Sequence, residues 1–146
     1  MKLYDIRTEY RKDPIGLAVK QPRFSWKIES DVKNTRQTQY RITVKTSDVI
    51  VWDSGPVSSE QSVLIPYEGE PLQEETRYQV TVEVEDNHGN RAEAEASFET
   101  GIFSGEHFAA KMITHDFPKA ETACPCFYQK ISVMWAVKRA VAFARA

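Results

Sequence analysis

Short runs of alternating apolar and polar residues recur between Pro22 and Thr100. The clearest runs cover residues 24–28, 40–45 and 78–85, and each places an apolar side chain at every second position. Successive side chains of a β-strand point to opposite faces of a sheet, so this alternation is typical of strands with one buried face. The pattern therefore predicts an all-β domain.

Turn-forming residues separate these runs from three others. Residues 49–52, 62–67 and 92–100 are predicted strands, and the first two are followed by turns that contain glycine and proline. Residues 86–90 have a central glycine and predict a hairpin connection to the last strand. Residues 6–17 are the candidate for a seventh strand.

Seven strands in about 95 residues predict a two-layered fold, because one open sheet with this pattern would leave its apolar faces in water. We expect a seven-stranded β-sandwich of the fibronectin-type-III or immunoglobulin-like kind, without helices. Burial of one large apolar side chain contributes about 1.5–3 kcal/mol, so a small set can form an adequate core. The expected core residues are Trp26, Ile42, Val44, Leu72, Tyr78, Val80, Val82 and Phe98.

The alternating pattern ends after Gly101. Residues 127–133 and 137–143 resemble two further strands, but two strands alone are marginally stable in water. We therefore predict a sandwich at residues 1–101, and at residues 102–146 a linker followed by the truncated start of a second β-domain. On this interpretation the rest of a larger protein lies beyond Ala146.

Charge and hydropathy bear on the possible partners. The 19 basic and 21 acidic residues are interspersed and give a formal net charge of -2, so no sustained positive field would attract nucleic acid or an anionic membrane. Residues 1–7 carry charges where a secretory leader has an apolar segment, and no apolar run approaches the ~20 residues that span a bilayer. We expect a cytoplasmic protein without nucleic-acid or membrane partners.

The two cysteines do not suggest a disulfide or a metal site. Cys124 and Cys126 are separated by a single residue and would close too small a ring for an easy disulfide. The nearest histidine, His115, stands in no recognisable zinc-ligand spacing with them. We expect no metal and no cofactor.

The acidic residues do not suggest a catalytic pair. Glu83, Glu85, Glu93 and Glu95 alternate with apolar residues, so we expect them on the solvent face of their strands. We assign no catalytic, cofactor-binding or metal-binding residue, and whether the chain belongs to an enzyme is left open by these positions.

The segment before the strand at 78–85 resembles a known structural motif. Leu72 precedes Thr76 by four residues and Tyr78 by six, which is the spacing of the tyrosine corner in fibronectin type III domains. In that motif the tyrosine hydroxyl hydrogen-bonds to backbone upstream and fixes the crossover between the two sheets. An ordinary loop before a strand is the alternative interpretation.

A series of short motifs follows in a fixed order along the first part of the chain. The series spans roughly the first 101 residues, and none of its motifs is diagnostic alone. The motifs are Arg7-Thr8-Glu9-Tyr10, Asp13-Pro14-Ile15-Gly16-Leu17, Pro22-Arg23-Phe24-Ser25-Trp26, Gln39-Tyr40-Arg41-Ile42-Thr43-Val44, Trp52-Asp53-Ser54-Gly55-Pro56-Val57, the segment 61–69, and Phe98-Glu99-Thr100-Gly101. In order and spacing, these motifs are similar to the N-terminal region of bacterial alpha-L-rhamnosidases (glycoside hydrolase family 78). A weaker resemblance at 109–113, 124–130 and 137–140 extends to the start of that family's next, jelly-roll-like accessory domain.

The resemblance implies a role without catalysis. Members of the family remove terminal alpha-L-rhamnose from glycosides by inversion, with an acidic pair in a helical domain much later in the chain. This chain would then be the non-catalytic N-terminal accessory domain, a structural module docked on the remaining domains of the parent enzyme. Two alternatives stay open. One is a carbohydrate-binding module making weak sugar contacts through Trp52, Tyr67 or Tyr4, and the other is a fibronectin-like protein-interaction domain.

Overall fold

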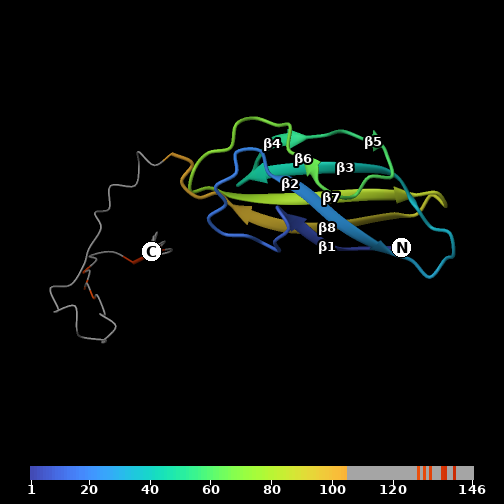
Figure 1. Ribbon diagram of the computed structural model, residues 1–146, viewed down its shortest axis with the longest axis horizontal. Coiled ribbons are helices and arrows are strands. Elements are labelled where there is room, and N and C mark those ends of the chain that lie inside the picture. Colours follow the sequence, from blue (N-terminus) through green and yellow to red (C-terminus); the bar gives the residue numbers. More distant parts are fainter. Residues whose placement is uncertain (105–127, 129, 131, 133–135, 138–139, 141–146) are drawn as a thin grey trace, which may run out of the picture. The chain divides into compact units, whose positions relative to one another are not determined.

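The computed structural model describes residues 1–104 together with 128, 130, 132, 136–137 and 140. Within residues 1–104, eight strands form two sheets that face each other as the layers of a sandwich (Figure 1). The predicted tail strands lie largely outside the described residues, and so do Cys124, Cys126 and His115. The domain boundary after residue 101 therefore stays a prediction.

Both sheets are antiparallel. The smaller sheet has the order β1-β2-β6, with β1 at Lys2–Thr8, β2 at Arg23–Glu29 and β6 at Ile65–Pro66. The larger sheet has the order β4-β3-β7-β8, and the short β5 also pairs with β3. Its strands are β3 (Gln37–Thr46), β4 (Val49–Asp53), β5 (Val57–Ser58), β7 (Arg77–Asp86) and β8 (Arg91–Glu99). The all-β, immunoglobulin-like sandwich predicted from the sequence is confirmed.

The inner faces of the two sheets hold the core. Each of the eight residues predicted for the core is buried, with at most 8% of its surface exposed. Phe98 connects the layers, because its ring centroid lies 6.0 Å from that of Phe24 in the opposite sheet and 5.1 Å from that of Tyr78. Aromatic rings at these separations stabilise a core beyond the area that they bury.

One buried polar side chain connects the two sheets. Gln37 of β3 is buried, and its amide oxygen accepts a hydrogen bond of 2.8 Å from Trp26 Nε1 on β2. The amide nitrogen donates to the carbonyls of Ser59 and Gln61, each at 2.9 Å. Because both ends of the amide have partners, its burial carries little penalty. Gln37 therefore ties β2, β3 and the segment after β5 together.

The hairpin predicted at residues 86–90 is present between β7 and β8. The carboxylate of Asp86 accepts hydrogen bonds from the N–H groups of His88 and Asn90, at 2.8 and 2.9 Å, and Gly89 takes a positive φ of 78°. Burial alone would raise the pKa of Asp86, but these N–H groups and the Asn90 side chain hold it below the ordinary value. The ionised Asp86 carboxylate therefore organises the turn.

The segment predicted as a seventh strand, residues 6–17, is only partly a strand. β1 begins earlier than predicted and ends at Thr8. Glu9, Tyr10 and Asp13 have positive φ angles of 47°, 67° and 44°. The main chains of Thr8 and Arg11 bond to each other around this left-handed turn, so the chain reverses after Thr8 instead of extending further.

The strand predicted at residues 62–67 is also shorter than expected, since only β6 pairs there. Leu64 has a φ of 54°, and its N–H donates to Ser25 Oγ at 2.9 Å instead of to a neighbouring strand. β5 was not predicted, because two residues are too few to show a period. None of the described residues belongs to a helix long and apolar enough to cross a membrane.

The tyrosine corner predicted from Leu72, Thr76 and Tyr78 is present. The Tyr78 hydroxyl accepts a hydrogen bond of 2.8 Å from the N–H of Gln73, upstream of the strand as expected. Thr100, just after β8, closes the same corner, because its hydroxyl donates to the Gln73 carbonyl at 2.6 Å and accepts from the Thr76 N–H at 2.9 Å. The corner therefore joins the start of β7 to the end of β8.

We predict that Tyr78→Phe lowers the free energy of unfolding by about 1–2 kcal/mol, because it leaves the partly buried Gln73 N–H without an acceptor. Urea denaturation of the chain measures the change. Tyr40→Phe is the matched control, since the Tyr40 hydroxyl makes no hydrogen bond within residues 1–104 and its loss should cost less than about 0.5 kcal/mol. Equal effects of the two changes would contradict the role given to the corner.

Candidate functional site

The motifs that carry the sequence resemblance make hydrogen bonds that stabilise turns and edges of the sandwich. Glu9 and Arg23 join the first and third motifs through two side-chain hydrogen bonds of 2.9 and 2.7 Å, and Glu9 also accepts from the Arg23 N–H. These bonds hold the pKa of Glu9 below its ordinary value and raise that of Arg23. The Arg23 guanidinium also lies 5.7 Å from the ring centroid of Tyr10. The motifs thus fix the turn between β1 and β2.

The motif at residues 13–17 covers the outer edge of β8. The Asp13 carboxylate accepts a hydrogen bond from the Ser97 N–H, and the Pro14 carbonyl accepts one from the Glu99 N–H, both at 2.8 Å. Leu17 then pairs with Thr100 in a parallel bridge. An uncovered edge strand is a template for unwanted pairing. The motif therefore satisfies the edge of β8 within the domain.

The motif at residues 52–57 fixes the return from β4. Asp53 accepts two hydrogen bonds from the Arg41 guanidinium, at 2.9 and 2.6 Å, and a third from the Gly55 N–H at 2.9 Å. Ser54 Oγ accepts from the Ile42 N–H at 2.9 Å. The Arg41 hydrogen bond first, and then that of Gly55, lower the pKa of Asp53 to about 2. This motif therefore stabilises the turn after β4 and its contact with β3.

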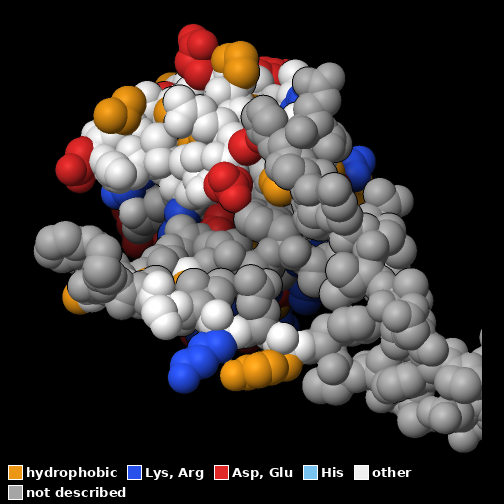
Figure 2. Space-filling view, turned by 90° about the vertical axis from the view of Figure 1, so that its left-hand side faces the viewer, with side chains coloured by type: hydrophobic (Ala, Val, Ile, Leu, Met, Phe, Trp, Pro, Cys, Tyr) orange, Lys and Arg blue, Asp and Glu red, His pale blue; other side chains and the backbone are white. Residues whose placement is uncertain are grey.

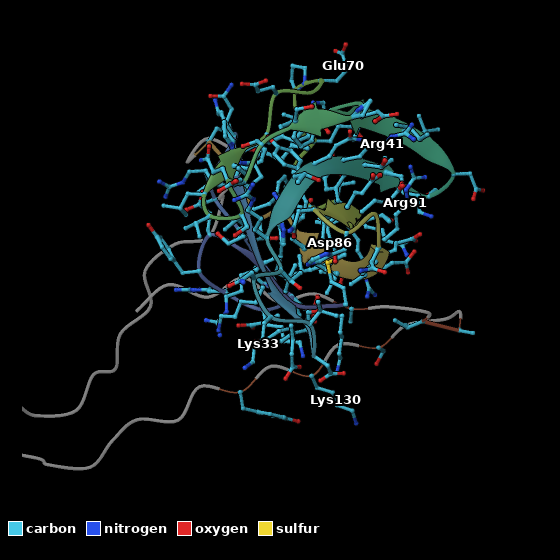
Figure 3. The ribbon with its side chains drawn as sticks, turned by 90° about the vertical axis from the view of Figure 1, so that its right-hand side faces the viewer. Lys33, Arg41, Glu70, Asp86, Arg91 and Lys130 are labelled. Carbon is cyan, nitrogen blue, oxygen red and sulfur yellow. The ribbon has the colours of Figure 1, made fainter. Side chains whose placement is uncertain are left out.

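The acidic residues on the outer face of the larger sheet do not form a catalytic centre. Glu83 and Glu93 lie opposite each other in the β7–β8 register and are exposed, as predicted. Glu85 is bonded to Arg91 at 2.9 Å, so this face carries charges of both signs. Arg41 and Arg91 project from it in Figure 3. The face has a shallow groove of about 470 Å³ that opens widely to solvent.

Metal binding has no support in the described part of the chain. Among those residues, no group of three His, Cys, Asp or Glu side chains could hold a metal ion.

The three aromatic residues proposed as a sugar platform do not come together on a surface. Tyr67 is 2% exposed, and its ring centroid lies 5.2 Å from that of Trp52, which in turn stacks on Phe24 at 6.1 Å. Burial, with smaller effects of Tyr78 and Glu70, raises the pKa of Tyr67 to about 12. Tyr4, the third candidate, is 39% exposed and stands on β1, in the other sheet.

The most distinctive surface is the end of the sandwich from which the chain continues after β8, here called the exit end. It contains the start of β2, the turn between β3 and β4, the start of β7 and residues 100–104. Glu74 anchors the departing chain, because one of its carboxylate oxygens accepts hydrogen bonds from the N–H groups of Phe103 and Ser104, at 2.6 and 3.0 Å. The direction in which the chain leaves the domain is therefore fixed as far as Ser104.

A groove of about 770 Å³, here called the exit groove, lies beside this anchor. Its apolar wall is formed by Val19, Pro71, Leu72 and Phe103. Close packing shapes one side, where a Cβ on Gly69 would clash with Trp52 Cβ, so no larger residue fits there without a shift.

Exposed apolar side chains gather at the exit end. Residues 1–104 contain eight exposed large hydrophobic residues, and five of them lie at this end. The five are Tyr10, Ile15, Val19, Val49 and Ile50. In Figure 2, which faces this end, the visible hydrophobic side chains lie apart from one another among charged ones. A non-obligatory interface is about as apolar as the rest of a protein surface, so separated apolar side chains are compatible with one.

The exit end was not predicted from the sequence. Its parts come from residues far apart in the chain, and no single motif brings them together. The sequence signals for this surface were aliphatic residues, such as Ile15 and Ile50, that do not belong to the buried face of a predicted strand. Those positions become informative only once the sheet order is known.

Comparison with known proteins identifies a matching family and similar proteins. Residues 3–104 match the family model described as "Rha78A-like, N-terminal immunoglobulin domain". An alpha-L-rhamnosidase of Streptomyces avermitilis is 39% identical over 120 residues, and one of Formosa agariphila is 32% identical over 110 residues. These alignments cover 77% and 70% of this chain but 12% of each relative. The chain thus spans about an eighth of the length of these curated relatives.

Solved structures contain a similar domain. The crystal structure of Streptomyces avermitilis alpha-L-rhamnosidase complexed with L-rhamnose has a TM-score of 0.71 and 38% identity, covering 75% of this chain and 11% of that one. The alpha-L-rhamnosidase from Dictyoglumus thermophilum has a TM-score of 0.70 and 33% identity, covering 75% of this chain and 13% of that one. The likeness is confined to a small part of each larger protein.

The Arg41–Asp53 pair should make stability depend on pH in acid. The pKa of Asp53 falls from 3.8 to about 2 on folding, so the stabilisation is complete above about pH 4 and is lost as the pH falls toward 2. We predict that Asp53→Asn slightly lowers the urea midpoint at pH 7, and that the difference from the native chain disappears near pH 2. The effect is small because solvent screens an exposed pair. A difference that persists at pH 2 would contradict it.

The Glu74 anchor should control the exchange of two amides. We predict that Glu74→Ala speeds hydrogen exchange of the Phe103 and Ser104 amides at least about tenfold, because both lose their acceptor. Glu74→Gln retains an uncharged acceptor and should have a smaller effect. Glu75→Ala, at an exposed neighbouring side chain, is the control and should leave both amides protected. Unchanged exchange in Glu74→Ala would exclude the anchor.

Proposed function

Since this chain belongs to the family of Rha78A-like N-terminal immunoglobulin domains, we propose that it is the non-catalytic accessory domain of an alpha-L-rhamnosidase and docks on the rest of that enzyme through its exit end. The observation that carries the docking role is the gathering of exposed apolar side chains at the end from which the chain continues. The parent enzyme is proposed to hydrolyse terminal alpha-L-rhamnosides, as the names of its relatives suggest.

The position of the exit end supports docking. The family is N-terminal by description, and the relatives are about eight times longer than the aligned region, so most of a relative's chain lies beyond this domain. The departing chain is held by Glu74 as far as Ser104, which keeps whatever follows close to the exit groove. A tethered neighbour has a high effective concentration, so modest apolar contacts are enough to hold it.

The chemistry of the described surface supports a role without catalysis. Inverting hydrolysis of a glycoside needs two carboxyl groups about 6.5–9.5 Å apart across a cleft that also admits water and sugar. Glu83 and Glu93 lie directly opposite each other on adjacent strands of one open sheet face, where paired Cβ atoms are about 4.5–5.5 Å apart, so they do not face each other across a cleft. Other carboxylates, such as those of Asp53 and Asp86, accept main-chain hydrogen bonds within turns.

A sugar-binding role has less support. Exposed aromatic platforms bind sugar rings, and two of the three candidates, Trp52 and Tyr67, pack against each other. The remaining candidate, Tyr4, is only partly exposed. Its chain neighbour Asp5 forms an ion pair with Lys27, with 2.8 Å between the carboxylate oxygen and the ammonium nitrogen.

The proposal is tested with three proteins: this chain, the full-length product of its gene, and the full-length product lacking residues 1–104. Release of a chromogenic aglycone from an alpha-L-rhamnoside measures activity, and thermal unfolding measures stability. We expect no activity in this chain, activity in the full-length protein, and similar kcat and KM in the deleted protein with its melting temperature lowered by roughly 2–8 °C.

Two results would overturn the proposal. Turnover by this chain alone would show that the domain is catalytic. A deletion that raises KM while leaving kcat and the melting temperature unchanged would favour the carbohydrate-binding alternative, because only substrate binding would then be lost.

A further inference from the structure

The turn between β3 and β4 presents two apolar side chains to solvent at the exit end. Val49 is 63% exposed and Ile50 is 59% exposed. The turn is tight, because Thr46 pairs with Val49 and only Ser47 and Asp48 lie between them. The two side chains therefore stand at the tip of a stiff hairpin, where they contribute little to the core.

The hairpin is poorly placed to pair its backbone with a strand of another chain. β4 is an edge of the larger sheet, and an open edge can pair with a strand of another chain. Here the loop after β6 covers its middle, where the Glu70 N–H donates to the Val51 carbonyl at 3.2 Å and Tyr67 packs on Trp52. Contact with a partner must therefore be made by the side chains at the tip.

We propose that the tip of this hairpin, with Val49 on one face and Ile50 on the other, inserts into an apolar recess in a part of the parent protein beyond residue 146. The inference rests on the proposed docking role and adds to it a second point of contact, distinct from the exit groove. The two charged side chains beside the tip, Lys45 and Asp48, have opposite signs, so the recess requires no net charge.

The position of the tip favours a contact with the parent protein over a contact with a second copy of the chain. β4 and β8 are opposite edges of the larger sheet with two strands between them, so the tip lies roughly 14 Å across the sheet from the strand that leads to the exit. One contact beside the exit would leave a tethered neighbour free to rotate. A second contact at this distance fixes its orientation, and only a partner that also faces the exit can make both.

The test compares amide hydrogen exchange in the 146-residue chain and in the full-length protein. We expect the amides of residues 47–51 to exchange at least about tenfold more slowly in the full-length protein, because docking removes the tip from water. Val49→Thr combined with Ile50→Thr keeps the branched shape that suits a strand but adds hydroxyl groups. This double change should abolish the extra protection without altering the exchange of the 146-residue chain.

Val32→Thr combined with Val63→Thr is the matched control. These two valines are 51% and 58% exposed and lie away from the exit end, so their change should leave the extra protection intact. Loss of protection in the control as well would overturn the proposal, since the effect would then be a general consequence of surface polarity.

The remaining outcomes separate this inference from the docking role. Protection of the exit groove at residues 72–74 without protection of residues 47–51 would overturn the inference and leave docking in place. Protection of neither segment would overturn both. Protection of residues 47–51 that rises with the concentration of the 146-residue chain would show self-association, and would overturn the inference by assigning the tip to a second copy.

Discussion

The hydroxyl of Thr100 is the constraint on which the exit end depends. Thr100 is 1% exposed, and its hydroxyl donates to the Gln73 carbonyl while accepting from the Thr76 N–H. A buried hydroxyl is tolerated only when its partners stay in place, so the end of β8 and the loop before β7 must remain together. The Tyr78 hydroxyl holds the same loop from the opposite side. The loop in turn positions Glu74, whose carboxylate fixes the next two N–H groups of the departing chain.

A fixed exit would lower the free-energy cost of the proposed docking. Ordering the backbone of one residue costs about 1–2 kcal/mol, so a junction that is already ordered inside the domain removes part of that cost before any neighbour is bound. The apolar contacts at the exit end can then be few and separated, as Ile15 and the Val49–Ile50 tip are. The outer face of the larger sheet is less suited to such contacts. Its charged side chains are paired within the domain, Arg41 with Asp53 and Arg91 with Glu85.

The parts of the fold that could be predicted are the strands whose buried side chains recur at regular intervals along the chain. β3 and β7 bury every second side chain, so their alternation identified the strands, the core and, with the Leu72 to Tyr78 spacing, the corner between the sheets. The errors fall where main-chain groups bond to side chains or irregular segments. Leu64 donates to a serine hydroxyl, and residues 13–17 cover the edge of β8 without forming a strand of their own. Such bonds leave no period in the sequence.

The exit end lies beyond prediction from sequence for a related reason. Its anchor is made by main-chain N–H groups, which every residue except proline possesses, and its apolar points come from separate turns. Because the main-chain groups of residues 100–104 that face the corner bond within the domain, a docking partner can recognise mainly side chains. Those side chains, such as Ile15 and Ile50, are exposed and contribute little to the core. On the proposed docking role, the residues that stabilise the fold differ from those that would contact the neighbour, so the docking surface can change while the sandwich stays the same.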